Sequence, residues 1–127
     1  MPKTYKDLDV YQRSFEATLD IYKTTENLPS YLQFDIGNDI RRAGRSVPSN
    51  ICEGYARKKS DKDTINFLKT ALGSNDEVLF NLLILYKLEK ISETDFTRLN
   101  NKYTIIGKQL TKLLFTKNNQ LVNQSTS

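Results

Sequence analysis

Apolar residues recur every three or four positions in four separate stretches of the chain, which is the spacing of one face of an α-helix. The first stretch runs from Leu8 to about Glu26, and it ends at residues 27–30, whose sequence Asn-Leu-Pro-Ser is typical of a turn. We predict a helix over this stretch with one face buried. The positions predicted to be buried are Leu8, Tyr11, Phe15, Leu19 and Tyr22.

The second stretch contains a proline, Pro48, in the middle of its helical pattern. A proline lacks a backbone N–H and its ring clashes with the carbonyl four residues earlier, which costs about 3 kcal/mol in a helix interior. That earlier residue is Gly44, whose missing side chain eases local rearrangement. We therefore predict one kinked helix rather than two short ones. Its apolar positions are Ile36, Ile40, Ala43, Val47, Ile51 and Gly54.

The third and fourth stretches each open with a serine followed by acidic residues, an arrangement that caps a helix N-terminus. Ser60 precedes the third stretch and Ser92 the fourth. Inside the third helix, the small Gly73-Ser74 pair is predicted to admit a neighbouring helix at close range. The third helix has a broad apolar face, formed by Ile65, Leu68, Ala71, Leu72, Val78, Leu79, Leu82, Leu85 and Tyr86. The fourth has a heptad-like seam, formed by Phe96, Leu99, Tyr103, Ile106, Leu110 and Leu113.

Four amphipathic helices joined by short connections predict an all-α fold, because each apolar stripe needs another helix to cover it. We expect an up-and-down antiparallel four-helix bundle over residues 1–117. The polar residues 118–127 have little to bury, and we expect them to form a disordered tail. A chain of 127 residues has the size of one domain.

The sequence contains no histidine and a single cysteine, Cys52. Without histidine the chain lacks the commonest general base and the commonest transition-metal ligand, so we expect neither an enzyme nor a metal or cofactor site. An active site built on Glu53 and Arg57 has no histidine or second acid to complete it. No run of about 20 apolar residues predicts a membrane helix, and the N-terminus lacks a signal-peptide pattern, so the expected location is the cytoplasm.

The net charge of +4 is unevenly distributed along the chain. Residues 41–62 carry seven cations and two acids, and the segment from Phe96 onwards carries five cations and no acid, so each has a net charge of +5. Such segments can bind phosphates, with Tyr55 able to stack on an unpaired base, but they also occur as solvated helix ends and flanks. The candidate nucleic-acid-binding residues are Arg41, Arg42, Arg45, Tyr55, Arg57, Lys58, Lys59 and Lys62. A second basic stripe on the last helix consists of Arg98, Lys102, Lys108 and Lys112.

Polar residues at spacings of four, three and four form a ridge along one side of the second predicted helix. The ridge consists of Ser46, Asn50, Glu53 and Arg57. It has two interpretations. It is either a ligand or nucleic-acid site, or a hydrogen-bonded network that fixes helix register or a subunit interface.

The order of these motifs resembles the four-helix bundle proteins encoded within intervening sequences of bacterial 23S ribosomal RNA genes. The likeness covers roughly residues 5–115. It rests on Leu-Asp-Val-Tyr-Gln at 8–12, Ile-Arg-Arg-Ala at 40–43, Ser-Val-Pro-Ser-Asn-Ile-Cys-Glu-Gly at 46–54, Phe-Leu at 67–68 and Ala-Leu-Gly-Ser at 71–74, followed by Glu77. The departures are Cys52, where the family usually has alanine, and Phe34-Asp35-Ile36, where it usually has Tyr-Gly-Leu.

The resemblance implies a bundle protomer that assembles into a ring, often a pentamer, like the similar accessory proteins of diversity-generating retroelements. The leading hypothesis is a non-enzymatic homo-oligomer that associates with RNA, or another nucleic acid, through basic patches. The alternative is a structural or protein–protein interaction module with an unidentified protein partner and no nucleic acid. The resemblance also marks motif positions without assigning chemistry to them, namely Asn50, Glu53, Gly54, Gly73, Ser74 and Glu77.

Overall fold

The computed structural model describes residues 4–56 and 60–126, with side chains described up to residue 123. The four long helices are α1 (Asp9–Thr25), α3 (Asn38–Ala56), α4 (Asp61–Lys87) and α5 (Glu93–Thr126). Three short helical turns complete the element order, namely η1 (Tyr5–Asp7), α2 (Ser30–Leu32) and η2 (Gln33–Gly37). No β-strand occurs in these ranges, and the predicted all-α fold is confirmed.

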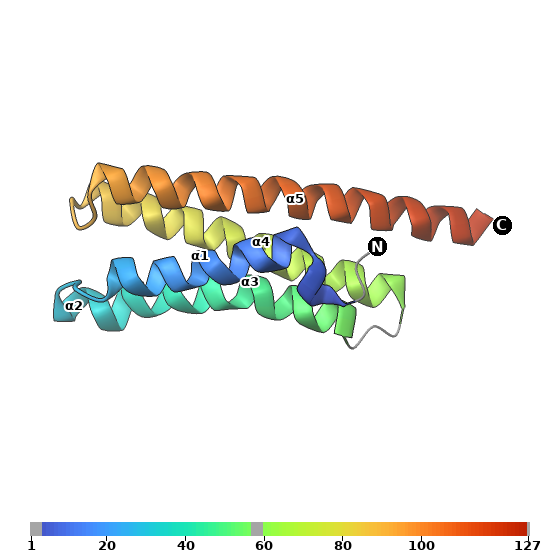
Figure 1. The fold of residues 1–127 in the computed structure, drawn as a ribbon, viewed down its shortest axis with the longest axis horizontal. Coiled ribbons are helices and arrows are strands. Elements are labelled where there is room, and N and C mark those ends of the chain that lie inside the picture. Colours follow the sequence, from blue (N-terminus) through green and yellow to red (C-terminus); the bar gives the residue numbers. More distant parts are fainter. Residues whose placement is uncertain (1–3, 57–59, 127) are drawn as a thin grey trace.

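The four long helices run antiparallel to their neighbours and form a bundle (Figure 1). Helix α3 packs against α1 and α4, and α5 packs against α4 and α1, so that each long helix has two neighbours. This arrangement is the up-and-down four-helix bundle that the sequence predicts. Within the part of the chain that the structure describes, no helix is both long enough and apolar enough to cross a membrane.

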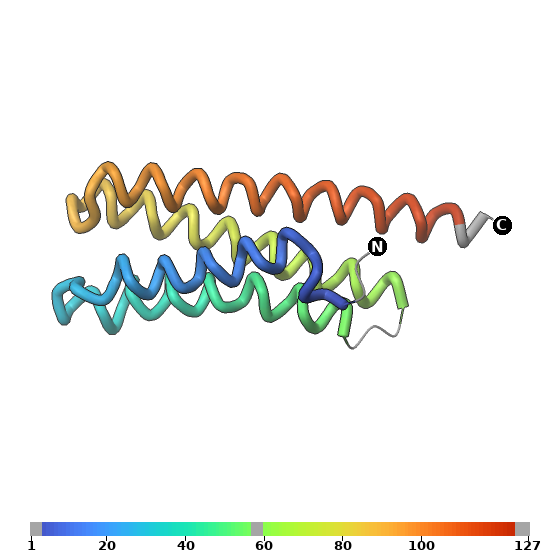
Figure 2. The backbone as a smooth tube through the Cα atoms, viewed as in Figure 1, coloured from blue at the N-terminus to red at the C-terminus, as the bar shows by residue number. Residues whose placement is uncertain are grey.

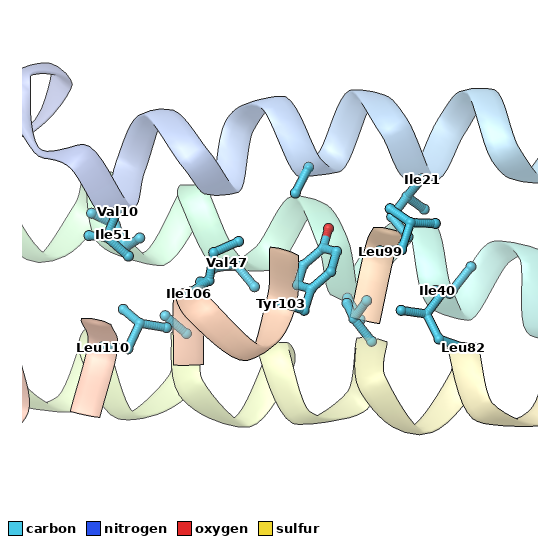
Figure 3. Packing of buried hydrophobic residues seen from close by; sticks show 14 of the residues in the cluster. Val10, Ile21, Ile40, Val47, Ile51, Leu82, Leu99, Tyr103, Ile106 and Leu110 are labelled. Carbon is cyan, nitrogen blue, oxygen red and sulfur yellow. The ribbon is translucent and has the colours of Figure 1, made fainter. Parts of the chain in front are cut away.

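The core contains one continuous layer of apolar side chains between the helices, shown in close-up in Figure 3. The predicted apolar positions of α3 are all buried, and those of α4 and α5 are buried or packed against the core. The largest fully buried side chain is that of Tyr103. The predicted serine caps are present as well, since Ser60 Oγ accepts from Asp63 N at 3.2 Å and Ser92 Oγ accepts from Asp95 N at 3.0 Å.

The buried face predicted for α1 is wrong at three of its five positions, while Leu8 and Tyr11 pack against the core. Phe15, Leu19 and Tyr22 are 49%, 52% and 40% exposed. The face that packs inward is made mostly of small residues, and it consists of Val10, Ser14, Ala17, Thr18, Ile21 and Thr25. The three hydroxyls on this face donate to carbonyls of α1 itself, so the helix can bury them without leaving an unsatisfied donor.

Helix α5 is longer than the sequence predicts. We expected the bundle to end at Lys117 and residues 118–127 to form a disordered tail, but α5 continues to Thr126. In Figure 2 the end of this helix extends past the other helices. No glycine or proline follows Gly107, and Leu121 still packs against the core, so nothing in this segment stops the helix.

Pro48 lies inside α3 without ending it, as predicted. Because Pro48 has no N–H, the carbonyl of Gly44 loses its donor within the helix. Thr18 of α1 replaces that donor, since its hydroxyl lies 3.0 Å from Gly44 O and shares its proton with Ser14 O at 2.7 Å. A Cβ at Gly44 would lie 3.5 Å from Tyr103 Oη, so three helices meet at this glycine.

An ion-pair cluster joins α1 to α5. Asp20 accepts hydrogen bonds from Arg98 Nε at 2.9 Å and from Lys102 Nζ at 2.8 Å, and Arg98 also pairs with Asp95 at 2.7 Å. Burial of the Asp20 carboxyl raises its pKa, but the hydrogen bonds from Arg98 and Lys102 outweigh that effect and lower the pKa to about 2. The cluster therefore holds Asp20 ionised and fixes the position of α5 along α1.

The lowered pKa of Asp20 predicts a pH-dependent contribution to stability. Because the folded-state pKa lies below the unfolded value near 4, the contribution is present above about pH 4 and is lost as the pH falls towards 2. We expect Asp20→Asn to lower the free energy of unfolding by about 1–2 kcal/mol at pH 7 and by much less at pH 2.5. Urea denaturation at several pH values measures this difference.

The matched control is Asp39→Asn, which removes an exposed pair with Arg42. It should change the free energy of unfolding by less than about 0.5 kcal/mol. An Asp20→Asn deficit that stays constant between pH 7 and pH 2.5 would show that the ion pairs are not its source.

Candidate functional site

The predicted nucleic-acid-binding residues do not form one patch. Arg41, Arg42 and Arg45 lie in the first half of α3, whereas Tyr55 and Lys62 lie where α3 ends and α4 begins. At 1.5 Å per residue, about 15 Å of helix separates Arg45 from Tyr55. The predicted residues 57–59, Arg-Lys-Lys, lie outside the described residues.

Arg41 holds the α1–α3 connection together. Its Nη1 donates to Thr25 Oγ1 and to Gln33 Oε1, each at 3.0 Å, and its Nη2 donates to Gln33 O at 2.9 Å and to Asn38 Oδ1 at 3.1 Å. A Cβ at Gly37 would lie 3.1 Å from Arg41 Nη2, so the guanidinium fits closely against the backbone of η2. With its donors engaged within the chain, Arg41 is a structural residue.

The other two arginines of this group remain accessible. Arg42 makes an exposed pair with Asp39, at 3.2 Å. Arg45 donates from Nη1 to the hydroxyl of Tyr22 at 2.5 Å, which draws its guanidinium towards α1. Each keeps donors for an external partner, and because residues three apart on a helix are only about 60° apart around its axis, the two side chains leave neighbouring parts of one side of α3.

The Tyr55 ring is half-buried. It packs against the core, and Lys117 Nζ lies 5.7 Å from its ring centroid. Burial also raises the pKa of the Tyr55 hydroxyl. Lys62, the second residue of α4, is exposed to solvent.

The basic stripe predicted on α5 is divided by the Asp20 cluster. Arg98 and Lys102 turn towards α1 and are engaged with Asp20. Lys108 and Lys112 are exposed and form no ion pair with any residue in the described ranges. Half of the predicted stripe is thus neutralised by the fold itself.

The polar ridge on α3 is a hydrogen-bonded network between helices. Ser46 Oγ lies 2.7 Å from Ser74 Oγ of α4, and Asn50 Nδ2 donates to Ser46 O at 2.8 Å and to Ser46 Oγ at 2.9 Å. These contacts support the interpretation that the ridge fixes helix register. Glu53 is half-buried at the same side of α3, and Glu77 is exposed on α4.

The two motif glycines of α3 and α4 differ in their surroundings. At Gly54 a Cβ would lie 3.1 Å from Phe67 Cβ, and Thr64 Oγ1 donates to the Gly54 carbonyl at 2.9 Å, so α3 and α4 approach closely there. At Gly73 a Cβ would meet nothing within 4 Å. The prediction that Gly73 admits a neighbouring helix is therefore wrong within one chain, and Ser74 alone makes the contact.

An apolar surface on α1 and α3 is the feature that the sequence analysis missed. We define the α1–α3 apolar face as Tyr11, Phe15, Leu19, Tyr22 and Pro48. These residues line a groove of about 360 Å³ that is open to solvent, with Arg45 at its edge. The signal was present as a helical spacing of large apolar residues, but it was assigned to the core.

A second groove lies between α4 and α5. We define the α4–α5 groove by its lining residues, which are Leu72, Asn75, Asp76, Leu79, Tyr103, Thr104, Gly107, Lys108 and Thr111. Its volume is about 370 Å³. Asn75 is 0% exposed and donates from Nδ2 to Tyr103 O at 2.9 Å, while its Oδ1 has no hydrogen-bond partner. A buried acceptor without a donor is uncommon in folded proteins.

Groups of three or more side chains suited to holding a metal ion do not occur in the part of the chain that the structure describes. The residues that the fold brings together form two grooves lined partly by apolar side chains and a polar seam between α3 and α4.

Comparison with known proteins finds a matching family model and similar solved structures. The model of the 23S rRNA-intervening sequence protein family matches residues 6–112. A crystal structure from Bacteroides thetaiotaomicron, described as a protein of unknown function from the S23 ribosomal protein family, is 30% identical. It aligns with a TM-score of 0.75 over 83% of this chain and 97% of that chain. No curated protein matches the chain.

Neighbouring arginines provide a test of the structural role of Arg41. We expect Arg41→Ala to lower the free energy of unfolding by about 2–3 kcal/mol, because it leaves Gln33 and Thr25 without their donor. Arg42→Ala removes the same charge from an exposed pair and should cost less than about 0.5 kcal/mol. Urea denaturation of both variants makes the comparison, and equal stabilities would contradict the assignment.

Proposed function

Because the chain belongs to the 23S rRNA-intervening sequence protein family, we propose that it is a non-enzymatic homo-oligomer that associates with RNA. The observation that carries the proposal is the α1–α3 apolar face, which one chain leaves open to solvent. Contiguous exposed apolar surface of this kind marks a site of protein contact. The resemblance to ring-forming relatives favours a pentamer among closed assemblies.

The energy of this exposed surface supports self-association. Complete burial of a large apolar side chain stabilises by about 1.5–3 kcal/mol. Because three such side chains are each about half exposed, their burial in a subunit contact would contribute on the order of 2–4 kcal/mol more. The α4–α5 groove adds a second surface on other helices, and α4 also exposes Phe80 and Leu83. A closed ring requires two different surfaces on each subunit, which this chain provides.

Light scattering tests the oligomer directly. We expect the purified chain to have a mass several times that of one chain at micromolar concentration. Leu19→Glu should shift it to the monomer, because a charge in the centre of the α1–α3 apolar face cannot be buried without a partner. Lys90→Glu, at an exposed residue between α4 and α5 that lines neither groove, is the control and should leave the assembly intact. A wild-type monomer would contradict this part of the proposal.

RNA association is supported by the cations that the fold leaves accessible. Lys62 is exposed where α4 begins, and only Ser60 and Asp61 separate it from the basic sequence Arg-Lys-Lys at 57–59. Arg42 and Lys112 add exposed positive charge elsewhere on the bundle. Since Tyr55 is covered by Lys117, we attribute RNA binding to phosphate contacts rather than to base stacking. Repetition of a weak basic patch around a ring would raise the affinity for a long strand through multivalency.

Salt dependence provides the test of RNA binding. We expect affinity for single-stranded or looped RNA to fall steeply with salt, and the triple variant Arg57→Ala, Lys58→Ala, Lys59→Ala to weaken binding and flatten that slope. The matched control Lys23→Ala, Lys87→Ala, Lys90→Ala removes the same charge from other exposed sites. Fluorescence anisotropy measures both. If the two triple variants bind equally well, the basic sequence at 57–59 has no special role and the protein–protein interaction alternative replaces RNA binding.

A further inference from the structure

We propose that the subunits join head to tail, with the α1–α3 apolar face of one copy seated in the α4–α5 groove of the next. This inference rests on the proposed homo-oligomer and adds which surfaces meet. The two surfaces are built from different helix pairs, α1 with α3 and α4 with α5, and share no helix. One copy can therefore use both at the same time, as a subunit of a ring must.

The shapes of the two surfaces favour this pairing. Phe15, Leu19 and Tyr22 stand out from α1 as a ridge of large side chains, each about half exposed. Gly107 and Asn75 line the α4–α5 groove, and a Cβ at Gly107 would lie only 3.0 Å from Asn75 Nδ2, so the two helices approach closely there. Apolar walls at Leu72 and Leu79 line the groove, so side chains from another helix would bury apolar surface there.

The hydrogen-bonding groups of the two surfaces are also complementary. The α4–α5 groove offers the exposed Asp76 carboxylate as an acceptor, and Asn75 Oδ1 is buried in its wall without a partner in the described chain. The α1–α3 apolar face offers donors. Arg45 uses Nη1 on Tyr22 Oη and forms no ion pair in the described ranges, and Tyr22 Oη accepts that bond, so its own proton is available.

Pairing each surface with its own copy would bring together groups of the same kind. Two α1–α3 apolar faces would place Arg45 near a second Arg45, and two α4–α5 grooves would place Asp76 near a second Asp76. Like charges at an interface are disfavoured. The remaining charges fit the head-to-tail arrangement too, because Lys108 lies in the groove and the exposed Glu16 lies beside Phe15.

Mixing two half-blocked variants tests the arrangement. Leu19→Glu blocks the α1–α3 apolar face. Thr104→Glu blocks the α4–α5 groove at an exposed lining residue, without changing the core. In a head-to-tail ring each variant alone should be monomeric. Mixed at equal concentrations, they should form a one-to-one dimer and nothing larger. The intact α1–α3 apolar face of the Thr104→Glu variant can bind the intact α4–α5 groove of the Leu19→Glu variant, and no other pair of intact surfaces remains. Analytical ultracentrifugation measures the masses, and circular dichroism verifies that both variants are folded.

The control variant is Thr116→Glu, an exposed threonine of α5 that lies outside the α4–α5 groove, and it should retain the wild-type mass. A second test exchanges the charges. Arg45→Asp and Asp76→Arg should each weaken assembly about tenfold or more, and the double variant should recover most of that loss.

The possible results separate the two proposals. A wild-type monomer contradicts the homo-oligomer and with it the head-to-tail contact. A wild-type oligomer whose mass survives Thr104→Glu, or whose Leu19→Glu variant still dimerises by itself, overturns the head-to-tail contact and leaves the homo-oligomer standing. A mixture of the Leu19→Glu and Thr104→Glu variants that remains monomeric also overturns the head-to-tail contact.

Discussion

The contact between Thr18 and the carbonyl of Gly44 sets the rotation of α1, on which most of the surface of this protein depends. Pro48 cannot donate to that carbonyl, and a buried carbonyl without a donor is costly, so a hydroxyl from another helix must face it. Gly44 has no side chain, and this lets α1 and Tyr103 of α5 come close enough. Once Thr18 points inward, the directions of the neighbouring side chains of α1 are fixed as well, because a helix rotates as one unit.

The apolar surface of α1 follows from this rotation. Successive residues of a helix are about 100° apart, so burying Thr18 and Ala17 directs Phe15 and Leu19 to the outside. The face of small residues packs into the core instead of the larger apolar residues, because it permits closer helix packing and supplies the hydrogen bond to the Gly44 carbonyl. A helix with large apolar residues left outside calls for another chain, and the proposed assembly supplies one.

The same rotation determines which positive charges are available. Asp20 lies on the side of α1 that faces α5, where it engages Arg98 and Lys102. Arg41 is used in the connection between α1 and α3. The accessible charge that remains on the described chain is less concentrated than the sequence suggests.

The sequence by itself determined the four helices, their antiparallel order and the inward faces of α3, α4 and α5, because in those helices the large apolar residues and the core-facing residues coincide. It also located the polar network of Ser46 and Asn50, because helical spacing places residues on one face whatever lies opposite. Only the tertiary structure decided the rotation of α1, the internal use of Arg41 and Arg98, and the continuation of α5 to Thr126. Periodicity gives the spacing of a stripe, but the choice between two neighbouring stripes depends on partners far away in sequence. For α1 that choice was made by a carbonyl 26 residues away.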